Sequence, residues 1–174
     1  MKLYEFELIF SLPDSAGSPD DIVDALFEAG CDDAVAGTGK RGRIALGFSR
    51  EAASAEQAMS SGRKQVCKAV PGAELIEAKP DLVNLSEIAG ILGCTRQNMQ
   101  KYASNSGKTA FPSPVHSGAP DIWHLYDVLS WLRGETNVAV DEVLIETALA
   151  AARLNAEARS RHFEAASASR RRAG

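Results

Sequence analysis

Residues 82 to 132 contain two short helical patterns separated by a three-residue turn, a spacing typical of a helix-turn-helix. Asn84 or Ser86 is expected to cap the first helix, and Gly93 suits the left-handed backbone that ends a helix. Thr95 is a good cap for the second helix, in which Met99 would turn back toward the first. The predicted apolar face of the first helix consists of Leu85, Ile88, Ala89 and Leu92.

The second helix leaves a polar face, and this face carries the candidate functional residues. Arginine can pair bidentately with guanine, glutamine can pair with adenine, and lysine can reach guanine or a phosphate. A solvated surface is the alternative interpretation, because every amphipathic helix has a polar face. If the segment binds DNA, the side chains that contact base edges are Arg96, Gln97, Gln100 and Lys101.

The next segment has the composition of a wing followed by a third helix. Prolines favour an extended conformation over residues 111 to 116, a Ser-Gly-Ala-Pro turn follows, and residues 121 to 124 alternate like a returning strand. His116 and His124 are expected to face each other across this wing, and residues 125 to 132 form an apolar helix. Contacts with the DNA backbone are predicted for Thr95, Lys108, His116 and Arg43.

This ordered set of motifs resembles the excisionase and AlpA-type branch of the MerR-like winged helices. That branch shares the pattern SEIA-x-x-LG-x-(S/T)-RQ, then FP-x-PV, then W-x-x-x-DV-x-x-WL. The resemblance covers residues 82 to 133 and implies a winged helix that binds double-stranded DNA, as in repressors, excisionases and terminase small subunits. The loop over residues 104 to 109 is longer than the pattern. The matching residues are Ser86-Glu87-Ile88-Ala89, Leu92-Gly93, Thr95-Arg96-Gln97, Phe111-Pro112, Pro114-Val115, Trp123, Asp127-Val128 and Trp131-Leu132.

Residues 1 to 79 have the pattern of a separate α+β domain. The predicted order is β-α-β-β-α-β, the ferredoxin-like arrangement. In the first helix, Ile22, Val23, Leu26 and Phe27 are expected to supply the apolar stripe. The expected elements are a strand over 3–10, a helix over 19–29, strands over 33–36 and 43–48, a helix over 51–70 and a strand over 73–78.

The glycine-rich loop over residues 37 to 42 is predicted to be a hairpin turn. It lacks the Gly-x-x-x-x-Gly-Lys-Ser/Thr pattern of a phosphate-binding loop, and it joins two strands rather than a strand and a helix. Contact of its basic residues Lys40, Arg41 and Arg43 with a DNA backbone remains the alternative to simple solvation.

Two segments follow the helix-turn-helix region. An alanine-rich stripe predicts a helix over residues 138 to 163 that either packs on its own chain or pairs with a second copy in a homodimer. Residues 164 to 174 lack periodicity and end in three arginines, so a disordered basic tail is expected. The linker around Pro80 is short, so the domain over residues 1 to 79 and the domain over residues 82 to 133 are expected to pack against each other.

Charge and composition limit the remaining possibilities. The net charge of −4 arises mainly in residues 1 to 80, which carry 9 basic and 13 acidic side chains. The helix-turn-helix region is close to neutral, so its non-specific affinity for DNA should be modest. No run of eighteen apolar residues predicts a membrane span. Three cysteines without a Cys-x-x-Cys pair argue against a disulfide framework or a zinc site.

Together these patterns favour a cytoplasmic protein that binds double-stranded DNA, either a transcriptional repressor or an accessory factor of a mobile element. Neither a cofactor nor a metal is expected, and no constellation of side chains indicates an enzyme. The alternative is a protein-interaction module, such as an antitoxin whose acidic N-terminal domain binds a partner protein.

Overall fold

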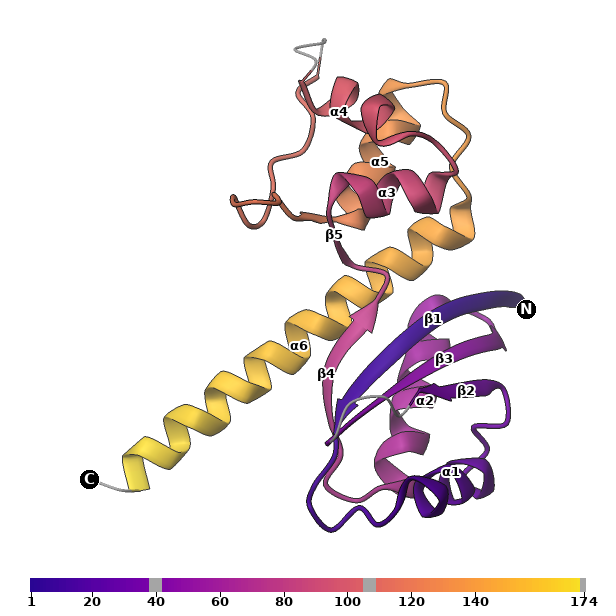
Figure 1. Ribbon diagram of the computed structural model, residues 1–174, viewed down its shortest axis with the longest axis vertical. Helices are drawn as coiled ribbons and strands as arrows, with labels where there is room; N and C mark the ends of the chain where they lie inside the picture. The colour runs from indigo at the N-terminus through magenta and orange to yellow at the C-terminus, as the bar shows by residue number, and fades with distance from the viewer. Residues whose placement is uncertain (38–41, 105–108, 173–174) are drawn as a thin grey trace.

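The computed structural model describes residues 1–37, 42–104 and 109–172. Within these ranges the chain is a mixed α+β protein with a four-stranded antiparallel sheet, a two-stranded sheet and six helices. Figure 1 shows two lobes with the long helix α6 running along both. We call them the sheet lobe, residues 2–79, and the helical lobe, residues 82–135.

The sheet lobe is built on a ten-residue central strand. Its alternation places Tyr4, Phe6, Leu8 and Phe10 in the core, as predicted. The strands lie in the order β2-β3-β1-β4, with neighbouring strands antiparallel. The elements are β1 (Lys2–Ser11), α1 (Pro19–Glu28), β2 (Ala34–Gly37), β3 (Arg43–Ala52), α2 (Ala55–Ala69) and β4 (Glu74–Lys79).

Two sequence predictions for this lobe are wrong in detail. The third strand extends to Ala52, and α2 begins only after Ser54, whose hydroxyl accepts a hydrogen bond from the Gln57 amide at 3.2 Å. In α1 the predicted apolar stripe is too wide, because Val23 is 42% exposed and Phe27 is 68% exposed. The stripe buried by this short helix contains only Ile22 and Leu26, which are one turn apart.

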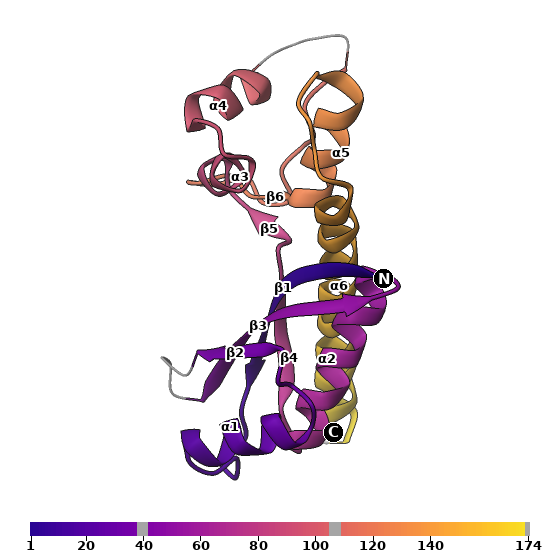
Figure 2. The ribbon, with the colours of Figure 1, turned by 90° about the vertical axis from the view of Figure 1, so that its right-hand side faces the viewer.

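The helices of the sheet lobe lie on one side of the sheet. Figure 2 shows α2 and α6 side by side against that face. Their side chains join one core with the inward residues of β1 and β3, including Met59 of α2 and Leu154 of α6. On the opposite face, Leu3 is 53% exposed, and Val35 of the edge strand is 79% exposed.

The helical lobe has its own small core. Short strands pair Leu82 with His124 and Val83 with Trp123, which closes the lobe at the point where the chain enters it. Its most buried side chains come from α3 and α5, together with Met99 of α4. The elements are β5 (Leu82–Val83), α3 (Leu85–Leu92), α4 (Arg96–Ser104), β6 (Trp123–His124) and α5 (Leu125–Glu135).

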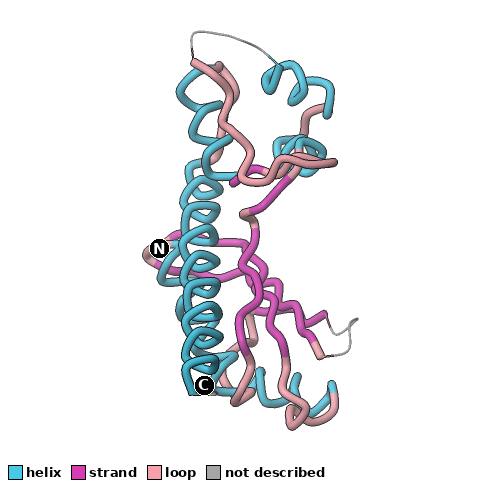
Figure 3. Tube along the Cα trace, turned by 90° about the vertical axis from the view of Figure 1, so that its left-hand side faces the viewer, coloured by secondary structure: helices cyan, strands magenta, loops and turns pink. Residues whose placement is uncertain are grey.

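Helix α6 (Glu142–Arg172) belongs to both cores. Ile145 and Ala148 pack in the helical lobe, whereas Ala151 and Leu154 pack in the sheet lobe. The predicted alanine-rich stripe is therefore used within the chain. The expected disordered tail is wrong as far as residue 172, because α6 continues through it without a glycine or proline to end it (Figure 3).

A buried polar cluster joins the two lobes to α6. The Asp81 side chain is fully buried; its carboxylate lies 2.5 Å from His124 Nδ1 and accepts a hydrogen bond from Asn155 Nδ2 at 2.7 Å. Asn155 also accepts from the Ala78 amide at 2.6 Å and donates to the Ala78 carbonyl at 2.8 Å. His124 therefore faces the lobe junction, and the prediction that it faces His116 is wrong.

Candidate nucleic-acid interface

The two helices of the candidate site are defined by local hydrogen bonds that the sequence predicted. Asn84 is the cap of α3, and its side-chain oxygen accepts hydrogen bonds from the Ser86 and Glu87 amides at 2.9 and 3.1 Å. The Glu87 carboxylate in turn accepts a hydrogen bond from the Asn84 amide at 2.8 Å. Gly93 ends α3 with φ of 64°, a left-handed conformation that side chains disfavour. Thr95 Oγ1 then accepts from the Asn98 amide at 3.2 Å, which starts α4.

Helix α4 is anchored by one face and leaves the other in solvent. Met99 is fully buried against the helical lobe, and Tyr102 and Ala103 are partly buried beside it. All four predicted base-contacting side chains are exposed, and so is Thr95. The structure therefore brings Arg96, Gln97, Gln100 and Lys101 together on one exposed helix surface, as expected from their spacing.

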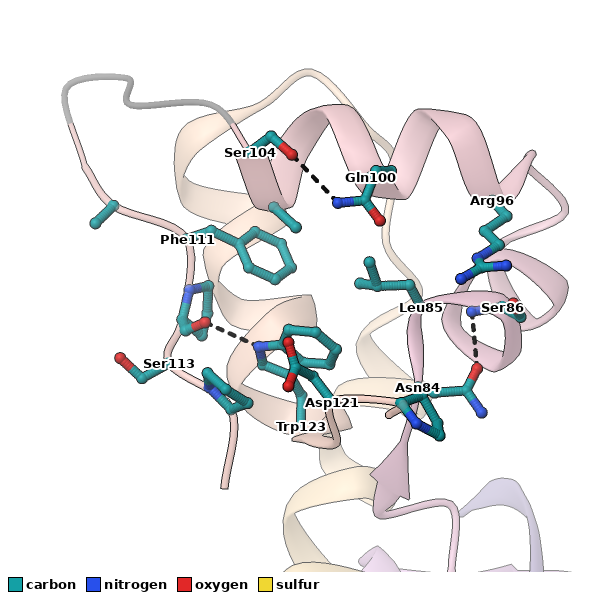
Figure 4. Close-up of a pocket in the computed structure, with 15 residues that line it drawn as sticks. Asn84, Leu85, Ser86, Arg96, Gln100, Ser104, Phe111, Ser113, Asp121 and Trp123 are labelled. Atoms are coloured by element: carbon teal, nitrogen blue, oxygen red, sulfur yellow. Dashed lines mark hydrogen bonds between the residues drawn. The ribbon is translucent and has the colours of Figure 1, made fainter. Parts of the chain in front are cut away.

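A cavity of about 840 Å³ divides these four side chains into two pairs. Arg96 and Gln100 line the cavity, and Gln100 Nε2 donates to Ser104 Oγ at 3.2 Å (Figure 4). Gln97 and Lys101 do not line it, and at 100° per residue they project further away from Met99. The polar surface of α4 thus has one side facing the cavity and one side facing solvent.

The far wall of the cavity is the segment that follows α4, held in place by aromatic residues. Trp123 Nε1 donates to the Pro112 carbonyl at 2.9 Å. The Phe111 ring packs edge-on against Trp123 and Trp131, with centroids 6.0 and 5.1 Å apart. These contacts fix the extended segment relative to β6 and α5, and Tyr102 of α4 packs on the same Trp131 ring, which together set the shape of the cavity.

The predicted wing is less regular than expected. Residues 111–115 form no strand, and His116 forms an isolated antiparallel bridge with Ile122. Asp121 accepts a hydrogen bond from the Gly118 amide at 2.9 Å and so holds the turn between them. His116 is exposed at this turn but does not line the cavity.

Of the remaining predicted backbone contacts, Arg43 lies in the described part of the chain and Lys108 does not. Lys40 and Arg41 also lie outside the described residues. Arg43 is exposed at the start of β3 and lines a separate cavity beside the C-terminal half of α6. The structure therefore does not place Arg43 with the side chains of α4.

Five polar residues that line the cavity were not predicted as site residues, namely Asn84, Ser86, Ser104, Ser113 and Asp121. Asn84 was recognised only as a cap, although it also lines the cavity. Ser113 and Asp121 line the opposite wall, and nothing in the sequence marks them, because their position depends on how the extended segment folds back. Asp121 adds a negative charge on the wall that faces Arg96, so the site is less basic than α4 alone suggests.

Residues 1–37, 42–104 and 109–172 contain no group of three histidine, cysteine or acidic side chains placed to hold a metal ion. Among the helices in these ranges, none combines the length and apolar character needed to cross a membrane. No family model, curated protein or solved structure matches the chain.

Proposed function

We propose that this protein binds double-stranded DNA sequence-specifically through α4, as a cytoplasmic repressor or an accessory factor of a mobile element. The exposed polar face of α4, anchored from behind by the buried Met99, is the observation that supports this most. The proposal includes the finer domain assignments, namely a ferredoxin-like domain over residues 1–79 and a MerR-like winged helix over residues 82–133.

The division of the α4 surface suggests different tasks for its two pairs of side chains. Gln97 and Lys101 project furthest from the lobe, so they would enter the major groove most deeply. Arg96 and Gln100, on the cavity side, would contact bases or phosphates on the strand nearest the extended segment. The nearby carboxylate of Asp121 would disfavour phosphate at the far wall.

The test is an unbiased selection of genomic fragments, followed by affinity measurements between about 50 and 200 mM salt, where phosphate contacts have a clear effect. Arg96→Ala should cost roughly 1–3 kcal/mol on the selected site and relax the preference at one base position. Lys68→Ala, an exposed lysine on α2, is the matched control and should leave affinity unchanged. Failure to select any fragment would reject the proposal.

Binding of a protein partner by the sheet lobe is the second candidate. The exposed apolar side chains of Leu3 and Val35 on the outer face of the sheet favour this function. The acidic charge of the lobe would not be sufficient by itself to favour it. Co-purification of a basic protein partner would support this function over DNA binding if the Val35→Asp variant loses the partner and the α4 variants keep it.

A further inference from the structure

A groove rich in arginine lies between the C-terminal half of α6 and the sheet lobe. It encloses about 650 Å³ and is formed by the end of β1, the start of β3, the second half of α2, β4 and residues 158–165 of α6. These elements are far apart in the sequence, so the groove is a product of the tertiary fold. Its positively charged side chains are Arg43, Arg63, Arg159 and Arg161, with His162 beside them.

The charge of the groove is opposite to that of the chain as a whole. Glu74 is the one acidic residue among the described residues that line it, in a protein whose net charge is −4. Arg161 pairs with Glu157 at 3.3 Å, one turn earlier in α6. No ion pair joins Arg43, Arg63 or Arg159 to another side chain in the described part of the chain. An occupant of this groove should therefore carry several negative charges.

The groove also exposes large apolar side chains. Phe163 is 65% exposed and Ile76 is 41% exposed, and both line the groove. A DNA backbone would satisfy the arginines but would leave these two side chains in water. The groove also lies near the end of α6 that is remote from α4 (Figure 1). Its chemistry therefore fits an acidic protein surface that carries apolar residues of its own.

The outer face of α1 is such a surface. Val23 and Phe27 are exposed one helical turn apart, the same two side chains that fail to enter the core of the sheet lobe. The exposed acidic residues of this helix that are not used in its capping box are Asp20, Asp24 and Glu28.

Both surfaces lie at the same end of the molecule. Figures 1 and 2 show α1 and the C-terminal end of α6 at the end opposite to α3, α4 and α5. We propose that the groove of one copy binds α1 of a second copy, and that the contact is made twice in a two-fold dimer. A reciprocal contact closes on itself, whereas a single head-to-tail contact would continue into a chain of copies. The pairing does not depend on DNA binding.

The test uses the full chain and two pairs of charge reversals. The groove variant carries Arg63→Glu and Arg159→Glu, and the helix variant carries Asp24→Lys and Glu28→Lys. Lys64→Glu is the matched control, because Lys64 is exposed on the same helix as Arg63 but does not line the groove. Sedimentation from about 1 to 100 µM, without DNA and at two salt concentrations, measures association. Thermal unfolding confirms that each variant is folded.

The wild type and the Lys64→Glu control should sediment at twice the 18.5 kDa monomer mass, and high salt should weaken the dimer. Each reversal variant alone should raise the dissociation constant roughly tenfold or more. An equimolar mixture should associate again, because each groove then meets an α1 of opposite charge. A monomeric wild type, dimers unaffected by the reversals, or folded variants that stay monomeric when mixed would each overturn the proposal. A separate DNA titration of the groove variant tests the phosphate alternative: loss of DNA affinity without loss of the dimer would assign the groove to phosphate and would also overturn the proposal.

Discussion

The two lobes differ in the size of their cores and in the elements that build them. The sheet lobe has long strands whose alternating side chains make most of its core, and α6 adds one wall. The helical lobe has short helices and fewer buried residues, 12 against 21, and it includes Ile145 and Ala148 of α6 among them. Among the described residues, α6 supplies two of the 12 buried side chains of the helical lobe and three of the 21 of the sheet lobe, so both cores depend on the same helix to a similar extent.

The contact between the lobes differs again from both cores. The cores are apolar, but the junction is a buried carboxylate satisfied by His124 and Asn155. Hydrogen bonds of this kind require defined distances and directions, whereas apolar packing tolerates sliding. The junction therefore specifies how the lobes are oriented, and the cores supply most of the stability.

Removing α6 should have the largest effect on this arrangement. Truncation after Asn137 deletes Ile145 and Leu154, each contributing about 1.5–3 kcal/mol on burial, from a total stability of about 5–15 kcal/mol. We expect circular dichroism and urea titration to show loss of cooperative folding. Truncation after Ala165 removes only exposed or undescribed side chains and should leave the transition unchanged. A cooperative transition in the shorter chain would show that the lobes need no shared helix.

Replacement of one buried methionine in each core should have the next largest effect on stability. Met59 in the sheet lobe and Met99 in the helical lobe are both buried, so Met→Ala at either site should cost about 2–5 kcal/mol. If α6 couples the lobes, both variants should lower one common urea transition. A separate early transition in Met99→Ala, seen by Trp123 and Trp131 fluorescence, would instead mean that the helical lobe unfolds alone.

The junction should respond less strongly but more specifically. Asn155→Ala leaves the Ala78 amide and one Asp81 oxygen without their partner, at a cost of about 1–3 kcal/mol. We expect the two lobes to unfold in separate steps, since their common junction is weakened while their cores are intact. Asn137→Ala, at an exposed position, is the control. An unchanged single transition would show that apolar packing on α6 alone couples the lobes.

The exposed contact between α6 and β1 should have the smallest effect. Hydrogen bonds from Lys2 Nζ at 2.6 Å and then Tyr4 Oη at 2.8 Å lower the pKa of Glu146 below its usual 4.5. The ionised carboxylate is favoured in the folded state, so this contribution is present above that value and is lost as pH falls through the lowered pKa. Glu146→Gln should reduce the acid sensitivity of the urea midpoint, whereas Glu135→Gln should not. Equal slopes for both variants would contradict the assignment.

Local rules in the sequence were enough to predict the elements around the candidate site. The capping residues Asn84 and Thr95 and the left-handed Gly93 act within a few residues of themselves, so their roles do not depend on the rest of the fold. The alternation of β1 and the inward position of Met99 follow in the same way from helix and strand periodicity. The expected boundary near residue 163 failed, because no local signal separates the tail from α6.

Long-range packing decided the rest. Periodicity marked the stripe on α6 as apolar, but only the folded chain shows that the stripe packs against both lobes. Likewise, alternation assigned His124 to the wing, but the tertiary structure turns its ring to Asp81, 43 residues away in the sequence. The Asp81 carboxylate also accepts a hydrogen bond from Asn155. The sequence determined which side chains each element offers, since that depends on backbone geometry over a few residues. Which surfaces meet depends on how whole elements pack, and that was decided only by the tertiary structure.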